Sequence, residues 1–263
     1  MIRWKHAWRL RAGRCPMRAE VFGVPLDLLT MDQTVDRCIA LIESWKPVQH
    51  VVINAGKVVM MEDHPRLREI VAGCEIVNAD GQSIVWAGRL LGHAVPERVA
   101  GIDLMHRLLA EADARGWPVY FLGATPQVLG RCVDTIQHAH PKLVVAGMHD
   151  GYFDEDERVA ADVAASGARV LFVGISSPRK EVFLSEQSLR IGPVFAMGVG
   201  GSFDVIAGMT RRAPLWMQRA GLEWLYRLAQ EPGRMWRRYL VGNARFVGLV
   251  MREWRVTRRR CRR

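Results

Sequence analysis

Asp80 is the residue of this chain best placed for proton-transfer chemistry. It follows the apolar run Glu-Ile-Val-Asn at 75–78 after one alanine and precedes Gly81, so it lies where a predicted strand ends and a helix begins. A carboxylate there could remove a proton from a hydroxyl group as a general base. It could equally cap the following helix, a commoner role that contributes about 1 kcal/mol. The residues alone leave both roles open.

Glycine and polar residues also follow the other predicted strands, at the edge of an open parallel sheet where ligands bind. The turn Gly-Val-Gly-Gly at 198–201 could let backbone N–H groups approach a diphosphate, or it could be a tight turn, since the full G-x-G-x-x-G pattern is missing. The candidate donor- or acceptor-binding residues at this edge are Asn54, Gly81, Gly123, Lys180, Glu181, Gly200, Gly201 and Asp204.

The elements that must position these residues are apolar strands alternating with helices. The alternation predicts an α/β fold, a Rossmann-like parallel sheet with helices on both faces. Thr30 and the pair Thr125-Pro126 are predicted to begin helices, and residues 21–29 to form an edge hairpin. The predicted strands are 49–53, 75–78, 117–122, 143–147, 169–174 and 194–199.

The positive charge of the chain is concentrated at one end. Residues 211–263 hold 15 arginines against three glutamates, a net charge of +12, although the whole chain carries only +10. The remainder is therefore slightly acidic, and the basic, Trp-rich end indicates a local device for phosphates or an anionic surface. A docking helix with a solvated basic face is the alternative, and we expect no nucleic-acid partner.

The composition divides the chain into a basic tail (1–19), an α/β core (20–210) and an Arg/Trp-rich appendage (211–263). No run of about 18 apolar residues predicts a membrane-spanning helix, and the first residues lack the apolar stretch of a secretory signal. The five cysteines are scattered without a C-x-x-C pair, which suits a reducing compartment. No common metal-binding or nucleophile motif occurs, so we predict no metal site.

Several short motifs, taken in order, resemble the WecG/TagA/CpsF family of bacterial glycosyltransferases. They cover roughly residues 20–245, and the last is a specific signature. The motifs are N-A at 54–55, N-A-D-G at 78–81, P-E-R-V-A-G-I-D-L at 96–104, F-L-G at 121–123, H-D-G-Y-F at 149–153, S-P-R-K-E at 177–181, G-V-G-G-S-F-D at 198–204, R-A-P-L-W at 212–216 and G-L-E-W-L-Y-R-L-A-Q-E-P-x-R at 221–234.

The resemblance implies an inverting, metal-independent transfer from a UDP-sugar to a saccharide carried on a polyprenyl diphosphate, without a cofactor. It implies that Asp80 is the base, that Arg227, Arg234 and Arg237 hold the donor diphosphate, and that the appendage closes the site at the bilayer. The expected location is cytoplasmic, peripheral on the inner face of the cell membrane. The resemblance leaves the oligomeric state open, with a homo-oligomer as one alternative.

Two departures from the family pattern concern the donor sugar. Val52 stands where the family usually has threonine, and Lys180 stands where it commonly has glutamine. A hydroxyl and an amide are lost, and such groups set sugar specificity. Members that build xanthan-type exopolysaccharides use UDP-glucose, which is the preferred donor, with UDP-N-acetylmannosamine and its uronic acid as alternatives.

Two other classes of protein share part of this pattern. A dinucleotide-dependent oxidoreductase would have the same alternation of strands and helices, and the incomplete glycine motif favours it. A nonenzymatic nucleic-acid-binding protein would explain a pI near 9.9 but leaves Asp80 and the glycines at the strand ends without a role.

Overall fold

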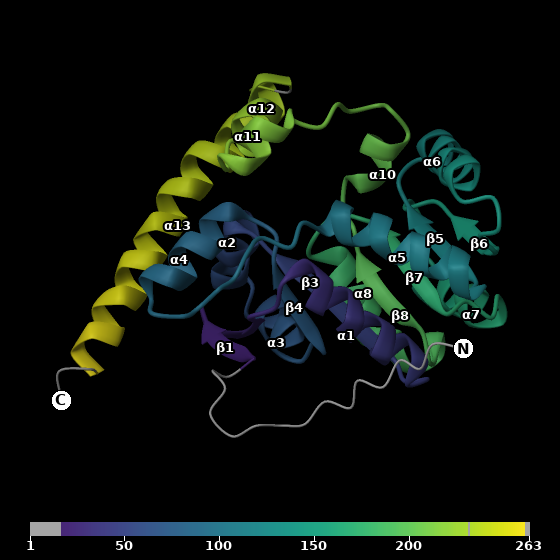
Figure 1. Ribbon diagram of the computed structural model, residues 1–263, viewed down its shortest axis with the longest axis horizontal. Helices are drawn as coiled ribbons and strands as arrows, with labels where there is room; N and C mark the ends of the chain where they lie inside the picture. The colour runs from purple at the N-terminus through teal and green to yellow at the C-terminus, as the bar shows by residue number, and fades with distance from the viewer. Residues whose placement is uncertain (1–16, 231, 261–263) are drawn as a thin grey trace, which may run out of the picture.

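A six-stranded parallel sheet lies at the centre of the computed structural model, which describes residues 17–230 and 232–260 (Figure 1). Its strand order is β4-β3-β8-β7-β5-β6, and every neighbouring pair is parallel. The predicted Rossmann-like sheet is confirmed. The strands are β3 (Val48–Ile53), β4 (Ile76–Ala79), β5 (Val119–Gly123), β6 (Val145–His149), β7 (Val170–Gly174) and β8 (Phe195–Gly198).

Helices cover both faces of the sheet because its central strands are apolar on both sides. One face packs against α1 (Met31–Glu43), α5 (Gly101–Arg115), α6 (Pro126–Ala139) and the short α10 (Ser202–Ile206). The other face carries two hydrophobic cores, which contain the helices α2 (Ala55–Asp63), α3 (Pro65–Ala72), α4 (Gln82–Leu90), α7 (Asp156–Ala165), α8 (Arg179–Glu186) and α9 (Ser188–Ile191).

Two helix starts follow the expected chemistry. Thr30 accepts a hydrogen bond from the backbone of Gln33, whose side chain bonds back to Thr30, so α1 begins with a complete capping box. Thr125 caps α6, with Pro126 as the first residue of that helix. Both predicted starts are confirmed.

The predicted hairpin exists but does not join the central sheet. β1 (Arg18–Val21) and β2 (Val24–Asp27) form a separate two-stranded antiparallel sheet, beginning three residues earlier than expected. Asp27 Oδ2 accepts a hydrogen bond of 2.7 Å from the backbone N–H of Val77 in β4. Arg18 of β1 also donates to the carbonyls of Cys74 and Glu75, so side chains rather than a ladder of backbone bonds join the hairpin to the edge of the sheet.

The described part of the appendage forms three helices: α11 (Leu215–Arg219), α12 (Glu223–Gln230) and α13 (Pro232–Arg260). The sequence spacing predicts that Trp216, Glu223 and Arg227 lie near one face if the segment is a single helix. This prediction is wrong, because Gly221, at φ 70°, separates α11 from α12. The rings of Trp224 and Tyr239 lie 5.9 Å apart, so the chain turns back between α12 and α13.

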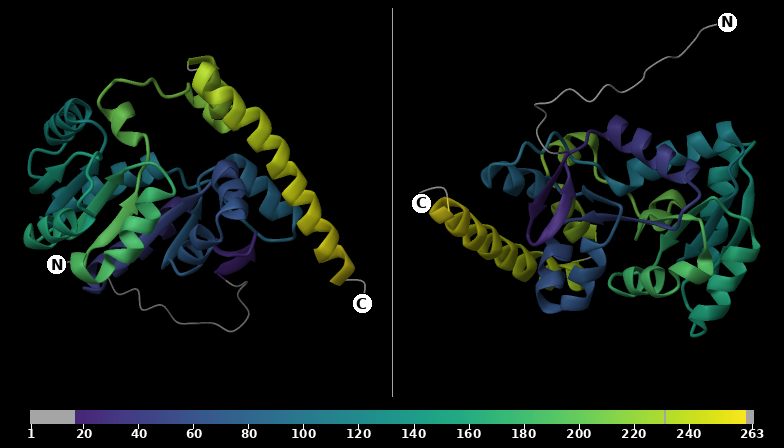
Figure 2. Two further views of the ribbon diagram at one scale, coloured as in Figure 1. Left: turned by 180° about the vertical axis from the view of Figure 1, so that it is seen from behind. Right: turned by 90° about the horizontal axis from the view of Figure 1, so that it is seen from below.

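The long helix α13 runs along the outside of α2, as the views in Figure 2 also show. Phe246 and Val250 are buried in the core beneath it. No helix among residues 17–230 and 232–260 combines the length and apolar character needed to span a membrane.

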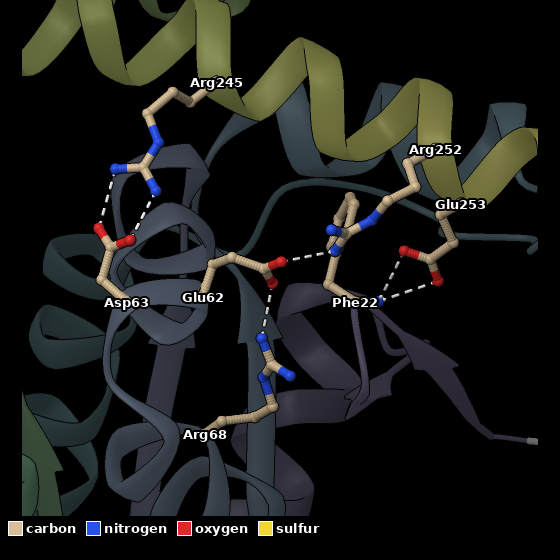
Figure 3. A network of polar contacts seen from close by, with 7 residues as sticks. All are labelled: Phe22, Glu62, Asp63, Arg68, Arg245, Arg252 and Glu253. Atoms are coloured by element: carbon tan, nitrogen blue, oxygen red, sulfur yellow. Dashed lines mark hydrogen bonds and ion pairs between the residues drawn. The ribbon is translucent and has the colours of Figure 1, made fainter.

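Polar contacts fix the same helix to the core (Figure 3). Arg245 forms two hydrogen bonds with Asp63, at 2.8 and 2.6 Å, and Arg252 pairs with Glu62 at 2.7 Å. Both oxygens of Glu253 accept from the backbone N–H of Phe22, at 3.1 Å. The appendage is therefore attached at several points far apart in sequence.

Candidate active site

Asp80 lies directly after β4, where its backbone N–H donates to the carbonyl of Ile53 at 2.9 Å. Its Oδ1 accepts a hydrogen bond of 3.1 Å from the backbone N–H of Gly101, the first residue of α5. The helix that follows Asp80 is capped by Gly81 without a side-chain bond. The helix-cap alternative is therefore wrong for α4, since Asp80 instead bonds to a helix 21 residues further on.

The surroundings of Asp80 raise the pKa of its carboxyl group above the ordinary value. Burial raises the pKa of the carboxyl group, and the negative charge of Glu223 adds to this effect. The Gly101 N–H and the charges of Arg98 and Arg227 act in the opposite direction. Charged residues of both the core and the appendage therefore affect the pKa of this one carboxyl group.

Two ion pairs join the appendage to the core near Asp80. Arg98 Nη1 lies 2.8 Å from Glu223 Oε2, and the side chains are only 15% and 22% exposed. Arg212 holds Asp103 with two bonds of 2.6 and 2.8 Å. Neither Arg98 nor Glu223 was predicted as a site residue, although both lie in motifs that resemble the family. The signal that could have identified them is a charged side chain among apolar residues, which indicates a need for a charged partner.

Asn54 and Gly81 lie side by side near Asp80. Asn54 caps α2, its Oδ1 accepting from the backbone N–H of Lys57 at 3.0 Å. A Cβ atom added to Gly81 would lie 3.4 Å from the Cβ of Asn54. Val52, two residues before Asn54, packs against Gly101, the first residue of α5. The structure thus brings two of the predicted binding residues together with the candidate base.

Lys180 and Glu181 belong to a buried charged cluster with Lys57, a residue that was not predicted from the sequence. Lys57 Nζ lies 2.7 Å from Glu181 Oε1, and Lys180 Nζ lies 3.3 Å from the same oxygen. Ser177 Oγ donates to Glu181 at 2.9 Å and accepts from Lys180 at 2.7 Å. Burial alone would raise the pKa of Glu181, but the two lysines lower it to about 2. This carboxylate therefore stays ionised.

Glu181→Gln should lower the free energy of unfolding by about 3–5 kcal/mol, because it leaves Lys57 buried without its partner. The stability from the ionised carboxylate is complete above its ordinary pKa of 4.5 and is lost as the pH falls through about 2. The difference between wild type and variant, measured by urea unfolding, should therefore shrink over that interval.

Glu186→Gln is the matched control, since Glu186 pairs with Arg66 at 3.7 Å where both side chains are at least half exposed. It should change the unfolding free energy by about 0–1 kcal/mol. Equal effects of the two substitutions would contradict the role given to the buried cluster.

The candidate glycines at the strand ends meet clear backbone requirements. Gly123 has φ 134°, and a Cβ there would lie 2.5 Å from the backbone of Gly174 in the neighbouring strand. Gly200, at φ 54°, forms the turn after β8, and Gly201 follows it in an exposed position. Asp204 lies in the short α10, and its carbonyl accepts the N–H groups of residues 209 and 210. Close packing and turn geometry explain the first two glycines without a ligand.

The three candidate diphosphate-binding arginines are divided between two helices. Arg227 lies in α12, partly buried and close enough to act on Asp80. Arg234 and Arg237 lie at the start of α13, and their side chains are outside the described part of the structure. Among the described residues, no group of three or more His, Cys, Asp or Glu side chains is arranged to hold a metal ion.

The fold and this site define a Rossmann-like α/β protein in which a carboxyl group at the end of a strand lies near one arginine of the core and one of the appendage. The family model described as Glycosyl transferase WecG/TagA/CpsF family matches residues 19–260. The chain belongs to this family, which confirms the resemblance seen in the motifs. Membership in a glycosyltransferase family implies a sugar donor and an acceptor, and it disfavours the oxidoreductase alternative.

Proposed function

We propose that the chain is an inverting, metal-independent hexosyltransferase. It transfers glucose from UDP-glucose to a saccharide on a polyprenyl diphosphate, in the synthesis of an exopolysaccharide or cell-envelope polysaccharide. The observation that carries this proposal is the position of Asp80, partly buried after β4 and under the charges of Arg98 and Arg227. A carboxyl group with a raised pKa holds an abstracted proton better than an ordinary aspartate.

In the proposed reaction, an acceptor hydroxyl oxygen attacks the anomeric carbon of the donor from the face opposite UDP. The new glycosidic bond forms as the bond from the anomeric carbon to the UDP oxygen breaks, which inverts the configuration. Asp80 takes the hydroxyl proton. Arginine guanidinium groups stabilise the negative charge that develops on the departing diphosphate. Arg227 is the described arginine that supports this role, through its charge near Asp80.

The surface of the appendage supports attachment to an anionic bilayer. Leu215 and Trp216 of α11 are 68% and 65% exposed, and Leu240 of α13 is also exposed. Arginines such as Arg219 and Arg255 lie exposed on the same helices. Exposed apolar and aromatic side chains accompanied by arginine are typical of helices that lie at a membrane interface. The proposed enzyme is thus peripheral on the cytoplasmic face, next to its lipid-linked acceptor.

UDP release tests the proposal directly. The chain, mixed with a polyprenyl-diphosphate saccharide and separately with UDP-glucose, UDP-N-acetylmannosamine and its uronic acid, should release UDP fastest from UDP-glucose. The rate should survive EDTA. A faster rate with an N-acetylmannosamine donor would reject the preferred sugar, and no release from any donor would reject the transferase proposal.

The assay includes EDTA and manganese because Asp154 and Asp156 have the spacing of a D-x-D motif, so the statement that no common metal-binding motif occurs is wrong. The structure places Asp156 at the start of α7, paired with Arg179 at 2.7 Å. Activity that is lost in EDTA and restored by manganese would show that arginines do not replace a cation. Asp156→Asn should leave the UDP-release rate unchanged.

A further inference from the structure

Glu223 links the appendage to the candidate base through a single core arginine. It is the first residue of α12, and its carboxylate holds Arg98 at 2.8 Å. Arg98 lies in the loop before α5, the helix whose first N–H group bonds to Asp80. Both charged groups act electrostatically on Asp80. The Arg98–Glu223 ion pair therefore connects the position of α12 on the core with the electrostatic surroundings of Asp80.

The contacts around α12 show that it is seated close against the core. A Cβ added to Gly221, just before α12, would lie 3.1 Å from the side chain of Gln82 and 3.2 Å from Trp86, both in α4. That helix begins two residues after Asp80. The low exposure of Arg98 and Glu223 strengthens their pair, because water screens it less than a surface pair.

We propose that Glu223 is a positioning residue that holds Arg98 at the Asp80 site only while α12 is seated on the core. The proposal rests on the proposed function and extends it to the closing of the same site. An appendage that lifts from the core withdraws Glu223 and Arg227 together and releases Arg98. Catalytic competence is then tied to the seated appendage.

A double-mutant cycle tests this role, with UDP release from the full chain as the measured rate. Glu223→Gln should lower kcat/KM about 10- to 100-fold, the loss expected for a hydrogen bond between charged groups. The same substitution should cost little further rate in an Arg98→Gln background. If the fold-losses in kcat/KM of the two single variants multiply in the double variant, Glu223 does not act through Arg98 and the proposal is overturned.

The pH profile separates positioning from simple loss of structure. Burial and the charge of Glu223 raise the pKa of Asp80, whereas the Gly101 N–H, Arg98 and Arg227 lower it. Glu223→Gln releases Arg98, whose effect on this pKa is larger than that of Glu223, and should therefore move the acidic limb of kcat/KM to higher pH. Asp63→Asn is the matched control, since it removes a core–appendage ion pair at α13 that lies outside this group. It should leave the limb in place, and an equal displacement in both variants would contradict the proposal.

Hydrogen exchange supplies a readout that does not need activity. In the full chain, Glu223→Gln should reduce amide protection in α12, whereas Asp63→Asn should spare it. Unchanged protection in α12 would overturn the proposal even if no donor is found. If the wild-type protein is inactive but Glu223→Gln still loses protection in α12, the proposed function is rejected. The ion pair is then retained as the contact that holds α12 on the core.

Discussion

Asp80→Asn should lower kcat by about 10²–10⁴ while leaving donor binding nearly unchanged. Asparagine keeps an oxygen that can accept the Gly101 N–H, so the substitution removes the base but not the contact with α5. Because burial raises the pKa of Asp80, the acidic limb of the wild-type rate profile should lie above the pH typical of an exposed aspartate. Steady-state kinetics and donor titration measure both effects.

Asp113→Asn is the control for this substitution. Asp113 is also partly exposed and accepts one backbone N–H, from Lys142 at 2.9 Å, at the far end of α5. Its kcat should match wild type. An Asp80→Asn enzyme that retains near wild-type turnover would reduce Asp80 to a structural acceptor for α5.

Arg227→Ala should lower kcat/KM by about 10²–10³, the loss typical of removing one group that stabilises developing negative charge. The loss should be the same for a soluble acceptor and for a lipid acceptor in liposomes, because Arg227 acts beside Asp80 rather than at the bilayer. UDP release with both acceptors measures it.

Two variants divide the appendage further. Arg219→Ala removes an exposed arginine of α11 and should leave turnover of a soluble acceptor unchanged. Deletion of 255–263 removes several arginines, each worth about 1 kcal/mol near an anionic surface, but keeps Phe246 and Glu253. It should weaken liposome binding and spare soluble-acceptor turnover. If the deletion abolishes that turnover and Arg227→Ala does not, the two roles have been assigned to the wrong segments.

The fold could be predicted from the sequence because its signals are local. The β-branched runs mark strands, and residues such as Thr30 and Thr125 satisfy the first N–H groups of a helix within three positions. The structure of the appendage could not be predicted in the same way, because the spacing of its apolar residues continues as one helical face across Gly221. That glycine takes a positive φ, and the packing of Trp224 on Tyr239 reverses the chain. Contacts between distant segments override a regular helical repeat.

The site was predictable only in part, for the same physical reason. The strand-end rule selected Asp80 and Asn54, which the structure places close to Gly81. It could not find pairs that join distant segments: Lys57 and Glu181 are 124 residues apart, and Arg98 and Glu223 are 125 residues apart. Lys57 within the apolar helix A-G-K-V-V-M-M carried a signal, because a lysine there must find a partner or water.

The contact between Phe22 and the α13 helix has a consequence for how the chain is made. The rings of Phe22 and Phe246 lie 5.5 Å apart, and Phe22 also donates to Glu253, 231 residues later. During synthesis from the amino end, the core beneath α13 cannot close until Phe246 and Val250 have left the ribosome. Until then the β1–β2 hairpin and α2 keep apolar surface uncovered, and the segment that covers it belongs to the appendage with its net charge of +12. Chaperones that shield apolar surface on nascent chains would meet this protein at that stage.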